Sequence, residues 1–252
     1  MSSHIPRALA VARVVVFGFA AANPVAGEDL PAKLKAEYEA VEKELRAGNW
    51  EAAEKGAAAQ FKDLMEKYAA QGGVDRDLVL YTMIRAVAEK GLGRDADASW
   101  HWHMAASLLP ALNGADLSPY GVPAKALQTE GVRARASAKG VKYTRDGPVG
   151  DLGGASAPKL DKDPSPRLPV RMKNVGGFYL VEVVVEADGR PSRPLVLGRR
   201  GPVALELLAL DKMREWVFKP AMKDGSAVVV PYLLGVGVGR PVGEVLVEAE
   251  EE

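Results

Sequence analysis

The chain contains no cysteine, and only three of its 252 residues are histidine. The lack of cysteine excludes disulfides, thiolate metal sites and cysteine nucleophiles together. It is compatible with a cytoplasmic protein or with an exported protein that has no disulfides. Acidic and basic residues are equal in number, 33 of each, so the formal charge is zero. No overall charge is available to bind a polyanion, and we expect no nucleic-acid partner.

Motifs typical of enzymes are also missing. The sequence has no Gly-rich phosphate loop and no Gly-x-Ser-x-Gly elbow. The run "GVGVG" at residues 235–239 lacks the strand-to-helix context that dinucleotide binding needs. A carboxylate pair brought together by the fold is left open, but no pattern points to one. We expect a protein that is not an enzyme and that holds no cofactor.

The run "WHWH", Trp100 to His103, is the one sequence with metal-binding character. On a strand, His101 and His103 would face the same side and could share a metal ion. The surrounding spacing is helical, and on a helix two such residues lie about 200° apart. We therefore expect no metal site, and a helix that packs Trp100 or Trp102 into the core.

Long hydrophobic runs are scarce, and the one candidate lies at the N-terminus. Arg7 and Arg13 precede an apolar run from Val14 to Ala22 that ends in small residues. This pattern predicts a secretory signal peptide over residues 1–26, cleaved after Ala22 or after Ala26, and hence a periplasmic protein. The alternative is an inner-membrane anchor over residues 8–26 in which Arg13 snorkels, although a span needs roughly 20 apolar residues.

Residues 28–140 have the apolar spacing of helices. The "GNWEAA" segment, Gly48 to Ala53, matches "GRDADA", Gly93 to Ala98, at an offset of 45 residues. The pairs resemble tetratricopeptide-type helical hairpins, which usually form binding surfaces; a plain helical bundle is the other interpretation. The predicted helices cover Leu30 to about Ala70 with a break at Gly48-Asn49 and an end at Gly72-Gly73, Arg76 to Lys90, Ala96 to Leu109, and Ala124 to Lys139.

A stretch rich in Gly, Pro, Asp and Lys, residues 141–165, predicts a flexible linker and a domain boundary. The next domain, residues 166–240, reads as strand, strand, helix, strand. Asp188-Gly189 predicts a hairpin, a helical spacing from Leu205 to Val217 stops at Lys219-Pro220, and residues 227–238 predict a long strand. Residues 241–252, with five Glu and no basic residue, predict a solvated acidic tail.

The C-terminal pattern resembles the C-terminal domain of the TonB family, the periplasmic energy transducers of Gram-negative bacteria. The resemblance covers about Pro166 to Gly239. It rests on Asp188-Gly189, on the helix, and on Trp216-x-Phe218-x-Pro220-Ala221 followed by an apolar strand. From their positions we expect Trp216 and Phe218 to straddle the helix end and pack on the sheet, with Pro220-Ala221 turning the chain into the last strand.

The resemblance implies that the last strand binds an extended segment of a protein partner, such as an outer-membrane receptor peptide, by strand addition. The candidate edge residues are Val228, Val229, Val230, Tyr232 and Leu234. The alternatives are an edge covered by residues 244–252 of the same chain or by a second copy in a homodimer. Arg190, Arg193, Arg199 and Arg200 are candidates for contact with anionic glycan or lipid, or form a plain solvated surface.

We thus expect an α+β fold with an all-α helical-hairpin domain before a small β-β-α-β domain. The expected function is partner binding in the cell envelope, within TonB-dependent transport across the outer membrane. The alternative is a periplasmic scaffold or adaptor that binds proteins through its helical repeats without transducing energy.

Overall fold

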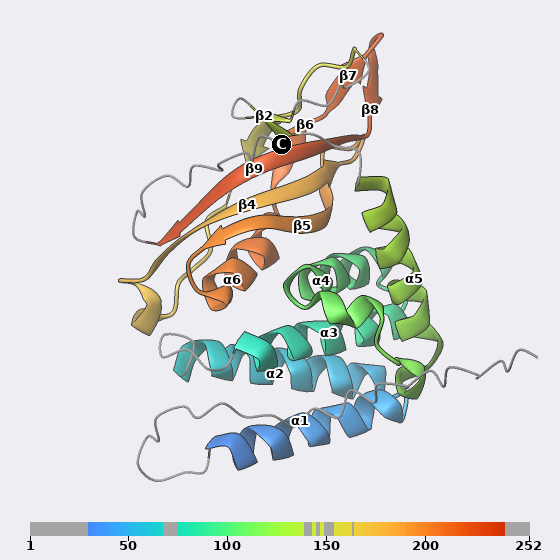
Figure 1. Ribbon diagram of the computed structural model, residues 1–252, viewed down its shortest axis with the longest axis vertical. Helices are drawn as coiled ribbons and strands as arrows, with labels where there is room; N and C mark the ends of the chain where they lie inside the picture. Colours follow the sequence, from blue (N-terminus) through green and yellow to red (C-terminus); the bar gives the residue numbers. More distant parts are fainter. Residues whose placement is uncertain are drawn as a thin grey trace, which may run out of the picture.

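The computed structural model describes residues 30–67, 75–138, 143–144, 147–148, 154–162 and 164–239. The predicted signal peptide or anchor, the end of the second helix at Gly72-Gly73 and the acidic tail lie outside these residues. The described chain is mixed α+β, as predicted: helices come first, and a small sheet region follows (Figure 1).

The five predicted helices are present, and their bounds lie close to the predicted ones. Apolar residues at three- and four-residue spacing give each of the first two an inner side, such as Leu34, Val41 and Leu45. Two short 3₁₀ helices, Pro110–Asn113 and Ser118–Tyr120, connect α4 to α5. The helices are α1 (Leu30–Arg46), α2 (Trp50–Lys67), α3 (Asp75–Gly91), α4 (Asp95–Leu108) and α5 (Gly121–Ala138).

The internal repeat is visible in the backbone. Gly48 and Gly93, 45 residues apart, both have φ of 75°. Each donates its N–H to the carbonyl three residues earlier, over 3.1 Å, and the residue after each glycine bonds five residues back. The alanines of the matched segments, Ala53 and Ala98, are both fully buried. The α1–α2 and α3–α4 turns therefore repeat one conformation, which the left-handed glycine permits.

The main sheet has three antiparallel strands, β4 (Gly176–Val185), β5 (Pro191–Arg200) and β9 (Val230–Gly239), in the order β5-β4-β9. The predicted hairpin at Asp188-Gly189 joins β4 to β5. Every second residue of β4 from Gly177 to Val185 is buried, and α6 (Val203–Met213) contacts all three strands. The helix thus covers one face of the sheet, while the helical hairpins lie next to β5 (Figure 1).

The predicted helix end is wrong. Helix α6 stops at Met213, and residues 217–219 form β6 (Val217–Lys219), in which Val217 and Lys219 are exposed and Phe218 is buried. An alternating β-branched and aromatic run favours a strand over a further helical turn. Strand β6 pairs with β3 (Lys159–Lys162), so the predicted flexible linker is wrong at β3, which is held in a ladder.

The predicted last strand is divided in two. Strand β7 (Ala221–Lys223) pairs with β8 (Ser226–Val228) in a small hairpin that turns at Asp224-Gly225, and β9 starts only at Val230. The remaining short elements are β1 (Tyr143–Thr144), β2 (Gly147–Pro148) and the 3₁₀ helix η3 (Val170–Met172).

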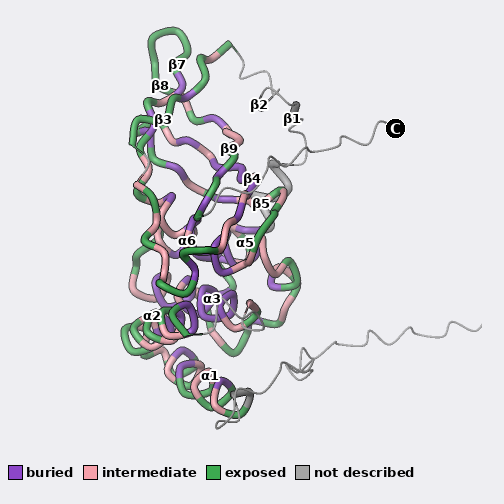
Figure 2. The backbone as a smooth tube through the Cα atoms, turned by 90° about the vertical axis from the view of Figure 1, so that its left-hand side faces the viewer, coloured by how far each residue is buried: buried purple, intermediate pink, exposed green. Residues whose placement is uncertain are grey.

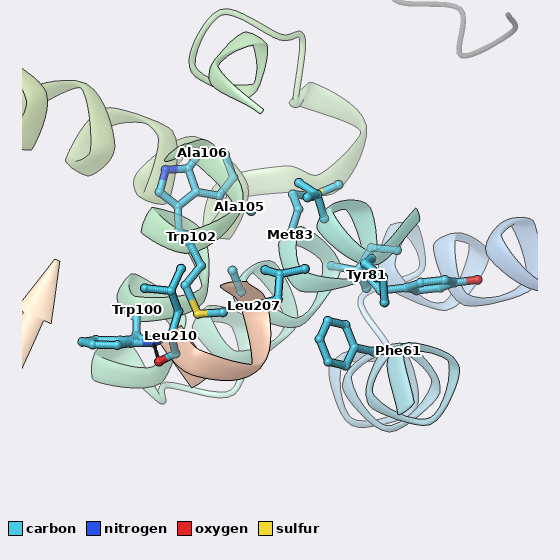
Figure 3. Close-up of a cluster of buried hydrophobic side chains, with 14 of the residues drawn as sticks. Phe61, Tyr81, Met83, Trp100, Trp102, Ala105, Ala106, Leu207 and Leu210 are labelled. Carbon is cyan, nitrogen blue, oxygen red and sulfur yellow. Dashed lines mark hydrogen bonds between the residues drawn. The ribbon is translucent and has the colours of Figure 1, made fainter. Parts of the chain in front are cut away.

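Helices and sheet share one core. Figure 3 shows Leu207 and Leu210 of α6 beside Trp100 and Trp102 of α4. Both tryptophans are buried, so the prediction that one or the other packs into the core is confirmed for both. Buried residues run through the middle of the molecule from α3 to the sheet, and exposed ones lie along its sides (Figure 2). The two parts therefore pack as one body.

The Asp188-Gly189 turn and the aromatic motif contact each other. The N–H of Phe218 donates to the carbonyl of Gly189 over 2.8 Å. A Cβ on Gly189 would lie 2.0 Å from the carbonyl oxygen of Phe218, and Gly189 has φ of 81°. Only glycine fits this contact, so two widely separated parts of the motif depend on each other.

We expect Gly189→Ala to destabilise the protein far more than Gly225→Ala. Both glycines have positive φ, 81° and 79°, but a Cβ on Gly225 meets nothing within 4 Å. Gly225→Ala should cost about 1 kcal/mol of backbone strain, and Gly189→Ala at least about 2 kcal/mol more, because the bond to Phe218 is lost. Urea denaturation measures both. Equal losses would contradict a contact specific to Gly189.

Candidate functional site

Strand β9 forms one edge of the sheet, and its backbone orientation follows from its neighbour. The N–H of Glu186 bonds to Arg190, and the Ser192 hydroxyl donates to the carbonyl of Val184 over 3.4 Å. Even-numbered residues at this end of β4 therefore direct their backbone groups towards β5. Since Val184 lies opposite Pro231, the backbone of Pro231 faces away from β4. This orientation suits a proline, which has no N–H to give to the ladder.

The register between β4 and β9 has no bulge, so the alternation continues along the strand. Leu233, Gly235 and Gly237 therefore direct both N–H and C=O to the free edge. In the described part of the chain no strand pairs with this edge, although β2 lies near β9. The edge offers a short row of donors and acceptors to an incoming strand.

The five predicted edge residues lie in β8, in β9 and in the connection between them. Val228 lies in β8 opposite Ala221, and Val229, 50% exposed, lies between the two strands. Val230, Tyr232 and Leu234 belong to β9, but their backbone groups face β4. Partner binding by this strand stays a prediction, and the backbone groups that could serve it are those of the alternate residues.

The aromatic motif forms a row beneath the sheet end. The rings of Trp216 and Phe218 lie 6.5 Å apart, and Phe218 meets Tyr232 of β9 edge-on at 6.0 Å. Phe218 and Ala221 are buried, while Trp216 and Pro220 are half-buried. As expected, the motif residues pack on the sheet, but from β6 and its flanks and not from a helix end.

A buried polar network joins the helices to α6. His101 of α4 is fully buried; its Nδ1 lies 2.6 Å from Oε2 of Glu89 on α3, and its Nε2 lies 3.2 Å from Oδ1 of Asp211 on α6. Arg214 donates to Asp97 over 2.8 Å and also contacts Asp211 at 3.1 Å. The two ring nitrogens of His101 thus contact carboxylates from two different helices, α3 and α6.

The charge on Asp211 is stabilised by its neighbours. Burial alone would raise the pKa of its carboxyl, but the bond with His101 and the positive charges of Arg214, His101 and Arg85 lower the pKa to about 2. Beside it, the indole N–H of Trp100 donates to the carbonyl of Leu210 over 3.1 Å (Figure 3). The contact between α4 and α6 is thus both apolar and ionic.

This network contains the residue types of an acid–base site, but a substrate could not reach His101. His101 has no exposed surface, and its ring nitrogens contact two carboxylates and no nucleophilic hydroxyl. The carboxylates contact opposite nitrogens of the ring, so the three groups do not converge on one point. Among the described residues no group of three His, Asp or Glu side chains could hold a metal ion. The network is suited to fixing α6 against the helices.

A second buried carboxylate, Glu206, lies on α6 near the start of the helix. Both of its oxygens are buried without a hydrogen bond, although Nε of Arg199 lies 3.3 Å from Oε2. Burial raises the pKa of Glu206 to about 7; Arg199 opposes this shift and Asp75 adds to it. The carboxyl is therefore partly protonated near neutral pH.

The four arginines do not form one patch. Arg190 and Arg193 lie at the turn end of β5, whereas Arg199 and Arg200 lie at its far end, roughly 20 Å away at about 3.3 Å per residue. A cleft of about 1140 Å³ lies beside the turn end, between α4, α5 and the β4–β5 turn. Its walls carry Lys125, Glu130, Glu186, Asp188, Arg190 and Arg193 among others.

The chain matches no protein-family model and no curated protein. Among the residues that the structure describes, no helix combines the length and apolar character needed to cross a bilayer.

No sequence pattern indicates the network at His101. Its members are separated by 12 and 110 residues, and a histidine among apolar helix positions has the pattern of an ordinary core residue. The sequence does contain a signal for the backbone direction of Leu233, Gly235 and Gly237. Pro231 has no N–H, so in a paired strand its backbone faces away from the neighbouring strand, and every second residue after it does the same.

We expect Asp211→Asn to lower the free energy of unfolding by about 1–2 kcal/mol at neutral pH, since it removes a charge that His101 and two arginines share. Because the folded-state pKa is depressed, the parent's advantage is complete above about pH 4 and disappears as pH falls towards 2. Denaturation at several pH values measures this difference. Asp97→Asn, at a half-exposed partner of Arg214, should cost less than about 0.5 kcal/mol.

We expect Glu206→Gln to have the opposite pH dependence. The folded state holds a proton that the unfolded state releases near pH 4.5, so the parent loses stability as pH rises from 4.5 to about 7. The variant avoids this loss and should be more stable than the parent at pH 8, by up to about 3 kcal/mol. The two should be equal near pH 4. A constant difference across this range would show that Glu206 does not titrate as described.

Proposed function

We propose that this chain is an exported, non-enzymatic envelope protein that binds an extended segment of a partner by strand addition to β9. The proposal follows the resemblance of residues 166–239 to the TonB C-terminal domain, and with it a role in TonB-dependent transport across the outer membrane. The supporting observation is the free edge of β9, where Leu233, Gly235 and Gly237 direct their backbone groups outward.

The composition of the edge favours close approach by another strand. Gly235 and Gly237 are exposed and carry no side chain, and a Cβ on Gly237 would meet nothing within 4 Å. A partner backbone can therefore approach to hydrogen-bonding distance without displacing side chains. Pro231 lacks a donor, so pairing on this edge begins at Leu233 and extends towards Gly237.

The arrangement of the motif also supports the proposal. The order β4, β5, α6 and β9 keeps the predicted strand, strand, helix, strand sequence, with β6, β7 and β8 inserted before the last strand. The Asp188-Gly189 turn, Phe218 and Tyr232 form a continuous set of contacts. These contacts hold the turn end of the sheet, next to which the partner strand would lie.

A second candidate is a periplasmic scaffold that binds proteins through the helical repeats without transducing energy. The cleft between α4, α5 and the β4–β5 turn favours it, because that cleft is lined by polar side chains from both parts of the molecule. In this case the partner would bind there and leave the amides of β9 unaffected.

We expect Gly237→Pro to weaken strand addition at least tenfold, because it removes one of the outward N–H groups of the edge. The matched control Gly237→Ala keeps that N–H and adds a Cβ in open space, so it should bind like the parent. The probe is a synthetic peptide, Ser-Thr-Val-Thr-X-Thr-Val-Thr-Ser with X as norleucine, titrated by calorimetry.

Amide hydrogen exchange of the complex locates the peptide. We expect slower exchange at Leu233, Gly235 and Gly237. Slower exchange at α4 and α5 instead would favour the scaffold, and equal affinities of the proline and alanine variants would rule out strand addition at this edge.

A further inference from the structure

The second face of the sheet, opposite α6, is apolar and lies outside the core. Phe178, Leu180 and Val184 of β4 alternate with the buried residues that face α6, and are only half-buried. They, with Leu195 and Leu233 on the flanking strands, do not belong to the main core cluster. We call these five residues the outer face. No described helix covers it, and Figure 1 shows α6 on the other side.

Glu182 lies in the middle of the outer face. It pairs with Leu195 on β5 and with Leu233 on β9, and only 6% of its surface is exposed. Its carboxylate has no hydrogen bond or ion pair to any described residue. Burial raises the pKa of this carboxyl. Unlike those of Glu206, its oxygens are not fully buried, so they keep some contact with water. An apolar segment bound over them would remove that water and leave the charge unpaired unless the segment supplies a cation.

The neighbouring side chains do not supply such a cation. On β5, Arg193 pairs with Glu186 at 3.1 Å, Arg199 faces α6 and pairs with Glu206 at 3.3 Å, and Arg200 lies opposite Phe178, four positions along β4 from Glu182. A second copy of this chain would bring another Glu182 to the same surface and repel it. No described residue supplies a cation to Glu182, so a bound partner of different sequence is the source to consider.

A strand added to β9 can deliver this cation. Neighbouring strands lie about 4.8 Å apart, so the added strand lies roughly 10 Å from β4. Every second side chain of that strand extends the outer face. From a position beside Leu233, a lysine or arginine can extend over the apolar side chains of β9 towards the carboxylate of Glu182, as long basic side chains do on apolar surfaces. The ring of Phe178 occupies the space over Gly235, where a Cβ would lie 2.6 Å from it.

We propose that the outer face with Glu182 selects the partner: it takes an extended, apolar segment that carries one lysine or arginine on the side facing Glu182. This inference rests on strand addition at β9 and specifies the chemistry of the strand that is added. Apolar residues two positions before and after the basic one would cover Leu180 and Val184.

The test compares three forms of the probe Ser-Thr-Val-Thr-X-Thr-Val-Thr-Ser, in which X is lysine, norleucine or glutamate. At pH 7.5 we expect the lysine peptide to bind about five- to tenfold more tightly than the norleucine peptide, and the glutamate peptide to bind most weakly. The lysine preference should decrease as pH falls and Glu182 takes up a proton.

Glu182→Gln keeps the shape of the side chain and removes its charge, so it should abolish the lysine preference while the norleucine peptide binds as before. Glu186→Gln removes the same charge at the β4–β5 turn, where Glu186 already pairs with Arg193, and should retain the preference. Thermal denaturation of Glu182→Gln checks the fold, and we expect it to be at least as stable as the parent.

The outcomes separate the two proposals. If the norleucine peptide binds and slows exchange at Gly237 but lysine adds nothing, strand addition holds and the role of Glu182 is wrong. If no peptide binds, both are wrong. If Glu182→Gln retains the lysine preference, the role of Glu182 is also wrong, because another group would then bind the lysine of the peptide.

Discussion

The packing of α6 is the constraint on which the rest of the structure depends. Its apolar side covers the inner face of the sheet, and its other side meets the helices through the Trp100–Leu210 hydrogen bond and the His101–Asp211 contact. Because α4 also lies along β5, one edge and one face of the sheet are already occupied by this chain. Within the described part of the chain, no strand pairs with the edge of β9 and no helix covers the outer face. These are the surfaces proposed for the partner.

Local patterns predicted much of the fold, and contacts distant in sequence did not follow from them. The helices, the Asp188-Gly189 hairpin and the repeat of the Gly48 turn at Gly93 each depend on a few adjacent residues, so their patterns were sufficient. The helical spacing and Pro220 predict that α6 ends near residue 219. Instead, Phe218 lies in a strand because it pairs with Leu160, 58 positions earlier in the chain. The His101 network could not be predicted for the same reason, because Asp211 lies 110 residues from His101. At the candidate site, the sequence predicts the strand but not which of its residues direct their backbone groups to the free edge.

The sequence of β9 is unusual for a strand that only completes a sheet. Three of its ten residues are glycine, and these have few favourable side-chain contacts and a large entropy loss on folding. All three occupy positions whose backbone faces outward. The residues between them, Val236 and Val238, are buried and hold the strand to the core. Two of the glycines also serve contacts within the chain: the ring of Phe178 lies over Gly235, and a Cβ on Gly239 would lie 2.1 Å from the carbonyl oxygen of Val175. Gly237 meets no such neighbour within 4 Å, so it is the position where another backbone can approach most closely.

Three carboxylates in the sheet and α6 have different electrostatic surroundings. Asp211 is surrounded by a histidine and two arginines, and its pKa falls to about 2. Glu206 has one imperfectly aligned arginine, and its pKa rises to about 7. Glu182 has no counter-charge in the described part of the chain. The chain thus surrounds an acid with positive charge where the two halves meet, as Asp211 shows. Under the proposal, an apolar partner segment would remove water from Glu182, and its cation would offset the cost of burying that charge. The same carboxylate would then distinguish partners that carry a cation from those that do not.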